Sequence, residues 1–86
     1  MTVREFTSRV WYGQEIVIIK WADFDKIFRE DCVIPGTEQT ALERIREKAL
    51  MTGANHDLRS VTYESVNNMI VDSYGVYENL LIIEVH

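Results

Sequence analysis

Apolar residues gather in two dense runs, Ile16–Ile19 and Leu80–Ile83, in which consecutive positions are apolar rather than alternating. Both runs are rich in β-branched or large aliphatic residues, and they predict strands over 15–21 and 80–85. The stretch 3–12 is also rich in strand formers, and Gly13-Gln14 suits a two-residue turn. We therefore expect the first 21 residues to form a β-hairpin.

Between the two runs, apolar residues recur at helical spacing. Residues 23–32 are predicted to form a short helix, with Asp23 as its N-cap and Phe24, Ile27 and Phe28 on one face. A turn is expected at Pro35-Gly36, because proline presets the first central position of a turn and glycine tolerates the second.

A second helix is predicted after this turn. Thr37 suits the N-cap, Glu38 places a carboxylate at the positive helix end, and Gly53 is the expected stop. The charged residues of this segment are typical of a solvated helix face. Its apolar stripe consists of Ala41, Leu42, Ile45 and Ala49.

The segment 58–76 fits two structures. A helix would run from Thr62 as cap to Gly75 as stop, with an apolar face made of Tyr63, Val66, Met69, Ile70 and Tyr74. A strand is also compatible with 60–66, where apolar and polar residues alternate. We prefer the helix.

The element order is therefore β-β-α-α-(α or β)-β. This order predicts one α+β domain over residues 1–86, with an antiparallel or mixed sheet of three to four strands and two to three helices. Because both faces of the two apolar strands need cover, and so few short helices cover one face only, we expect an apolar patch and a homodimer.

Composition places the chain among ordinary globular proteins, with 47% apolar and 27% charged residues in 86 positions. No apolar run approaches the roughly 20 residues of a membrane span. The first residues lack the basic start and apolar stretch of a secretory signal. The single cysteine, Cys32, excludes an internal disulfide. These features predict an intact cytoplasmic protein without membrane contact.

Charge is distributed unevenly. All nine basic residues lie before residue 60, where acids nearly balance them, whereas Glu64, Asp72, Glu78 and Glu84 follow without any lysine or arginine. Direct nucleic-acid binding needs clustered basic residues, so we do not expect it. A basic protein partner fits better, although acids also serve solubility alone.

Catalytic candidates are few. Cys32, His56 and Asp57 have the residue types of a cysteine nucleophile site, yet no local signature accompanies them. A small core cysteine at the end of the first predicted helix, with His56-Asp57 in a polar loop, explains them better. Two distant histidines and one cysteine form no metal-ligand spacing. We expect no enzyme activity, cofactor or metal.

Two surface features remain as candidates for binding. Trp11, Tyr12, Tyr74 and Tyr77 are expected to be partly exposed, and such residues are favoured in binding surfaces. Carboxylates repeated along strands and helices can also imitate the phosphates of DNA. The candidates for this acidic surface are Asp23, Glu30, Asp31, Glu64, Asp72, Glu78 and Glu84.

Two segments carry a resemblance, Val10-Trp-Tyr-Gly-Gln-Glu-Ile-Val-Ile-Ile-Lys-Trp and Phe28-Arg-Glu-Asp-Cys-Val-Ile-Pro-Gly-Thr. With its size and acidity, the chain resembles the small early proteins of T-even phages, and among them the anti-restriction nuclease proteins. The resemblance implies a dimer that mimics duplex DNA in the host cytoplasm and occupies the DNA-binding surface of a restriction nuclease such as McrBC. The alternative is a small inhibitor or adaptor that docks on a protein through aromatic and apolar contacts.

Overall fold

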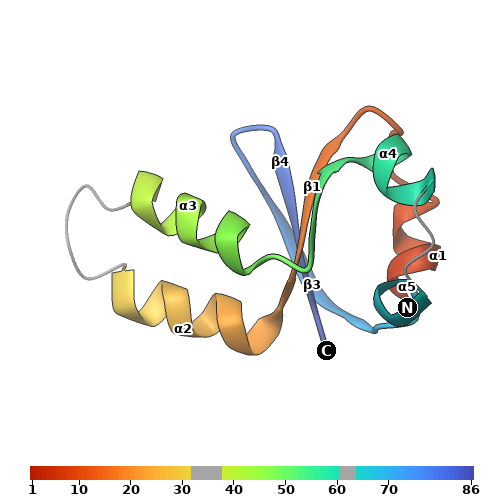
Figure 1. Cartoon of the computed structure of the whole chain (residues 1–86). Coiled ribbons are helices and arrows are strands. Elements are labelled where there is room, and N and C mark those ends of the chain that lie inside the picture. The colour runs from red at the N-terminus through yellow and green to blue at the C-terminus, as the bar shows by residue number, and fades with distance from the viewer. Residues whose placement is uncertain (32–37, 61–63) are drawn as a thin grey trace.

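The computed structural model describes residues 1–31, 38–60 and 64–86, which form one mixed four-stranded sheet with helices on both faces (Figure 1). The predicted α+β class is confirmed, although the described residues form more helices than expected. In chain order the elements are α1 (Val3–Thr7), β1 (Glu15–Lys20), α2 (Trp21–Asp31), α3 (Glu38–Lys48), β2 (Met51–Ala54), α4 (Asn55–Ser60), α5 (Glu64–Asn67), β3 (Val71–Tyr77) and β4 (Leu80–Val85).

The two dense apolar runs become the central strands of this sheet. The strand order is β2-β1-β4-β3, in which β1 and β4 lie parallel and both outer pairs are antiparallel. Central strands bury both of their faces, which explains why neighbouring residues in both runs are apolar. The strands predicted at 15–21 and 80–85 are confirmed.

Each face of the sheet carries its own core. On one face, Ile16, Ile18, Leu81, Ile83 and Val85 pack with Val3 of α1 and Val66 of α5. On the other face, Val17, Ile19, Leu80 and Ile82 pack with Ile27 of α2 and with Ala41 and Ile45 of α3. Figure 1 shows α2 and α3 on one side of the sheet and α1, α4 and α5 on the other. The prediction that one face of the sheet is uncovered is therefore wrong. The homodimer stays a prediction, but the covered faces no longer support it.

The expected β-hairpin over the first 21 residues is also wrong, because the chain begins with helix α1. Thr2 and Glu5 form a capping box: the Glu5 N–H donates to Thr2 Oγ1 at 3.2 Å, and the Thr2 N–H donates to Glu5 Oε1 at 3.1 Å. These bonds satisfy two backbone donors at the helix start, and burial of Val3 adds packing energy. Together they override the strand preference of the segment.

The two longer helices lie close to their predicted positions. Helix α2 begins at Trp21, so Asp23 lies in its first turn and is not the N-cap. The stripe of α3 packs as expected, with Leu42 and Ala49 beside the buried residues, but α3 ends at Lys48. Gly53 belongs to strand β2, which the sequence did not predict, and its φ of 147° suits glycine. Cys32, Pro35-Gly36 and Thr37 lie outside the described residues.

The helix preferred for 58–76 is wrong over most of its length. Two short helices, α4 and α5, are followed by strand β3, and Gly75 lies inside that strand instead of ending a helix. The strand considered for 60–66 is wrong as well, since α5 begins at Glu64. Residues 61–63, which include the expected cap Thr62, lie outside the described residues.

Candidate docking site on hairpin β3–β4

A tight turn joins the last two strands. Glu78 and Asn79 have φ angles of 47° and 69°, the left-handed conformations that a two-residue hairpin turn requires. Tyr77 pairs with Leu80 directly across this turn. The turn is also held by the residue before β1, because the side-chain amide of Gln14 donates to the Asn79 carbonyl oxygen. Hairpin β3–β4 is therefore fixed at its closed end.

Strand β3 is an exposed edge of the sheet. Six of its seven residues are exposed, in contrast to the buried strand β4 beside it. Tyr74 and Val76 are 63% and 69% exposed, and Tyr77 is 37% exposed. In the part of the chain that the structure describes, no strand pairs with the outer side of β3. Exposed apolar side chains on an open edge are typical of a surface that meets another chain.

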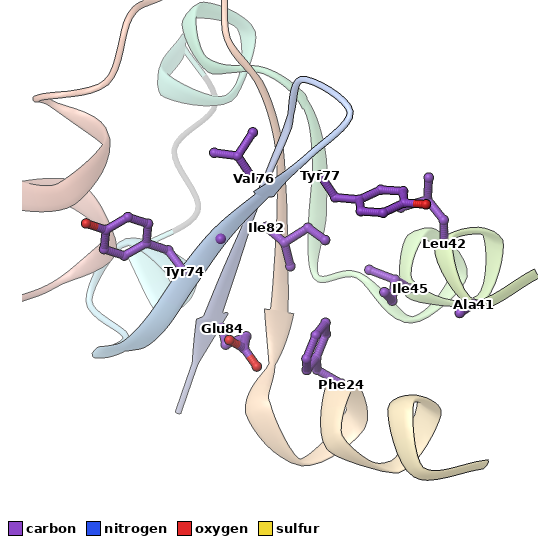
Figure 2. A pocket seen from close by; sticks show the side chains of 10 residues that line it. Phe24, Ala41, Leu42, Ile45, Tyr74, Val76, Tyr77, Ile82 and Glu84 are labelled. Atoms are coloured by element: carbon purple, nitrogen blue, oxygen red, sulfur yellow. The ribbon is translucent and has the colours of Figure 1, made fainter. Parts of the chain in front are cut away.

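An apolar groove, here called the Phe24 groove, lies between β3 and the helices α2 and α3. Its volume is about 390 Å³. Tyr77 reaches from β3 toward Leu42 of α3, whereas Tyr74 points to the opposite side of the sheet (Figure 2). Gly75 leaves space above Ile82, since a Cβ added there would meet no atom within 4 Å. The lining residues are Phe24, Ala41, Leu42, Ile45, Tyr74, Gly75, Val76, Tyr77, Ile82 and Glu84.

A second groove, here called the Phe6 groove, lies on the opposite face of β3. Its volume is about 620 Å³, and Tyr74 packs there against Phe6 with ring centroids 4.8 Å apart. Strand β3 is therefore flanked by a groove on each face. The lining residues of the second groove are Met1, Phe6, Arg9, Val10, Val71, Asp72, Ser73 and Tyr74.

Three of the predicted acidic residues come together on hairpin β3–β4. Asp72 lies at the open end of the hairpin, with its Oδ1 2.5 Å from His86 Nδ1. Glu84 is half-buried and accepts a hydrogen bond from Ser73 Oγ, which lies opposite it in the sheet. Glu78 is exposed in the turn at the other end. The hairpin therefore carries three carboxylates and no lysine or arginine.

The other predicted acids lie elsewhere. Glu64 is exposed on α5, whereas Asp23 is half-buried on α2, on the opposite face of the sheet. Glu30 and Asp31 lie in the last turn of α2. The seven predicted acids are thus distributed over both faces, with three on helix α2, three on hairpin β3–β4 and Glu64 on α5.

Of the catalytic candidates, His56 and Asp57 form a surface pair, whereas Cys32 lies outside the described residues. His56 Nδ1 lies 2.9 Å from the Tyr12 carbonyl oxygen, and its Nε2 lies 3.2 Å from Asp57 Oδ1. Both side chains are more than half exposed. Among the described residues, no group of three or more His, Cys, Asp and Glu could hold a metal ion.

The exposed aromatic residues were predicted correctly, because Trp11 and Tyr12 are 67% and 66% exposed and both tyrosines of β3 are also accessible. The exposed strand edge was missed, since 58–76 was expected to be helical. A signal was present in Glu78-Asn79, a polar pair that includes a turn former and separates two segments rich in strand-forming residues.

Comparison of the chain with protein-family models, curated proteins and solved structures found no match. The described helices also lack the length and apolar character needed to cross a membrane. The resemblance to phage anti-restriction proteins therefore stays a prediction, and the functional argument rests on the geometry of hairpin β3–β4.

Proposed function

We propose that this protein is a small inhibitor or adaptor that binds another protein through hairpin β3–β4. The observation that carries this proposal is strand β3, which exposes Tyr74 and Val76 on an edge that no described strand covers. Both side chains are more than half exposed, so the protein's own fold leaves most of their apolar surface in water, although the ring of Tyr74 contacts Phe6. They become stabilising when a partner removes them from water.

The chemistry of these residues suits protein binding. Tyrosine combines a large apolar ring with a polar hydroxyl group, and it is enriched among the residues that dominate interface energies. The Phe24 groove beside β3 offers a concave, mostly apolar surface for a side chain of the partner. The hairpin turn and the hydrogen bond from Gln14 to Asn79 hold this surface in place before binding, which limits the entropic cost of association.

A second candidate is a DNA-mimicking inhibitor of a host DNA-binding protein, such as a restriction nuclease. It is favoured by Asp72, Glu78 and Glu84, which lie on one hairpin without a basic residue beside them in the sequence from 60 to 86. A DNA-binding cleft lined by lysine and arginine would attract such a surface. The two candidates share a binding site and differ in which forces hold the partner.

Affinity capture from a bacterial host lysate tests the docking proposal when variants are compared. We expect the wild type to retain a protein that Tyr74→Ala combined with Val76→Ser does not retain. Tyr12→Ala is a matched control, because Tyr12 is as exposed as Tyr74 and lies away from the hairpin. Equal retention of the same proteins by the wild type and the hairpin variant would contradict the proposal.

Salt concentration separates the two candidates in the same experiment. A complex held by apolar contacts should persist between about 0.05 and 0.5 M salt, because screening weakens only charge interactions. A DNA mimic should lose most of its affinity over this range and should be displaced by duplex DNA.

A further inference from the structure

We infer that the partner supplies an extended segment that pairs with the open edge of β3, apolar at its centre and with a lysine or arginine at each end. This inference rests on the proposed function and adds the chemical class and conformation of the bound segment. It follows from the backbone direction, the two grooves and the positions of the carboxylates.

The backbone of β3 offers hydrogen-bonding groups on its open side. In a hairpin closed by a two-residue turn, the residues that flank the turn form a hydrogen-bonded pair, and such pairs alternate along the strands. Tyr77 and Gly75 therefore direct their backbone groups toward β4. The N–H and C=O groups of Val76 and Tyr74 face the open side, where an added strand would find them.

The same edge already pairs with an extended segment at its start. The Val71 N–H donates to the Met1 carbonyl oxygen at 2.9 Å, and Thr2 forms an antiparallel bridge with Ile70. The first residues of the chain thus occupy the edge up to Val71. The stretch from Ser73 to Tyr77 remains open to a segment of another chain.

The two grooves match the alternation of a strand. Successive side chains of an added strand point to opposite faces of the sheet. One set would lie beside Tyr77 and Gly75 at the Phe24 groove, and the other beside Tyr74 at the Phe6 groove. Both grooves are lined largely by apolar residues, so the centre of the partner segment should be apolar on both faces. Binding by strand addition commonly combines backbone bonds with such alternating sites.

The carboxylates of β3 and its turn determine which residues suit the two ends of the partner segment. Asp72 and Glu78 lie at the two ends of the open stretch, roughly 20 Å apart at the rise of a β-strand. Basic residues at both ends of the partner would meet a carboxylate each. Glu78 should contribute more than Asp72, because Asp72 already contacts His86 and shares its groove with Arg9.

A second copy of this chain fits the edge less well. Pairing β3 with β3 would bring two hairpins together, each with Asp72, Glu78 and Glu84 and no basic residue. Like charges brought close across a strand pair are destabilising. Charge complementarity therefore favours a basic segment of a different protein.

A synthetic peptide provides the test with the full-length protein. The probe has five alternating valine and isoleucine residues flanked by two lysines at each end, with a fluorescent label for anisotropy. One control peptide carries glutamates in place of the lysines. A second is N-methylated on alternate residues, which removes the backbone donors of one edge. We expect only the first peptide to bind, and we expect the amide protons of Tyr74 and Val76 to become protected from exchange in the complex.

Val76→Pro is the matching variant of the protein. Its missing N–H faces the open side, so the pairing of β3 with β4 keeps its hydrogen bonds, and proline is tolerated at such edge positions. We expect it to weaken peptide binding up to about tenfold, because the missing N–H removes one backbone hydrogen bond. Circular dichroism should show an unchanged fold. Glu78→Gln should weaken binding roughly two- to fivefold at low salt, and Glu47→Gln on α3 should not.

Several results would overturn the inference. Equal binding of the glutamate peptide would contradict the requirement for basic ends. Equal binding of the N-methylated peptide, or of the first peptide to Val76→Pro, would contradict strand addition. A dimer of the free protein that Val76→Pro dissociates, measured by light scattering, would show that a second copy occupies the edge. If no peptide binds although capture depends on Tyr74 and Val76, the docking function stands and strand addition fails.

Discussion

The buried side-chain amide of Asn55 donates a hydrogen bond to the carbonyl oxygen of Thr7 at 3.0 Å. The same nitrogen lies 3.0 Å from the Val10 carbonyl oxygen, so a single side chain holds the end of α1 and the segment that follows it. Asn55 itself begins α4 directly after β2. It therefore connects the first helix to the edge of the sheet opposite β3.

Asn55→Ala should destabilise the protein by about 2–3 kcal/mol, because the Val10 carbonyl oxygen loses this donor and the Thr7 carbonyl oxygen keeps only the Val10 N–H. Asn55→Asp should cost at least as much, since a carboxylate cannot donate and is itself buried. Urea unfolding followed by circular dichroism measures both changes. Asn68→Ala, at an exposed position, is the control and should differ little from the wild type.

Thr2→Ala should destabilise the protein by about 1 kcal/mol, the usual cost of losing an N-cap side chain. The hydrogen bond from the Thr2 backbone to the Glu5 carboxylate lowers the pKa of Glu5, with a smaller contribution from the Thr2 hydroxyl group. Stability from this bond is present above the ordinary pKa of a glutamate. It is lost as the pH falls through the lowered pKa.

The wild type and Glu5→Gln should therefore differ most near neutral pH, and the difference should shrink in acid. Denaturant unfolding at neutral pH and at pH below 4 measures it. A difference that grows on acidification would show that the capping box does not stabilise α1 through the charged form of Glu5.

Asn79→Val should destabilise hairpin β3–β4, because a β-branched residue at a φ of 69° costs roughly 1–2 kcal/mol. Asn79→Gly is the matched variant and should be tolerated, since glycine adopts this conformation freely. Thermal unfolding compares the two. Equal stability of both variants would mean that the turn is not held in the left-handed conformation.

Neutralising the acids of the last segment tests DNA mimicry. A variant with Asp72→Asn and with Gln at Glu64, Glu78 and Glu84 should bind its partner roughly tenfold more weakly at low salt, with a flatter salt dependence. The control neutralises Glu38, Glu43, Glu47 and Asp57 and should change binding less. Competition with duplex DNA for the captured partner is the assay. An unchanged first variant would leave the apolar contacts as the basis of binding.

His56→Ala should leave binding unchanged, because His56 and Asp57 form an exposed pair away from hairpin β3–β4. The measurement is capture of the same partner by the folded variant. Loss of function in this variant would instead favour a catalytic or metal-binding role for His56.

The sequence predicted the elements whose signals do not depend on the rest of the chain. The dense runs at Ile16–Ile19 and Leu80–Ile83 identify strands buried on both faces, and the stripe of Ala41 and Ile45 identifies one side of a helix. Prediction from local composition failed where side-chain hydrogen bonds at a helix start favour a helix over a strand. In α1, the cap made by Thr2 and Glu5 outweighs the strand preference of the residues that follow.

The sequence did not predict strand β3 for a different reason. Val71, Tyr74 and Val76 do not form a buried face, so no apolar alternation marks them as a strand. Their conformation depends on the turn at Glu78-Asn79 and on pairing with the buried strand β4. The sequence of an edge strand that is stabilised by its neighbour contains little strand signal of its own. The docking site was therefore not predicted either.

The parallel pairing of β1 with β4 has a consequence for synthesis of the protein. Glu15 lies opposite Leu80, so β1 is synthesised long before β4, its parallel partner, is available for pairing. Until then Ile16–Ile19 has only the short strand β2 to pair with, and this apolar run is open to chaperones and to aggregation. Such long-range pairing also slows folding, because the intervening chain must be ordered first. A nascent chain stopped before Leu80 can pair β1 with β2 but leaves the other side of β1 without a strand.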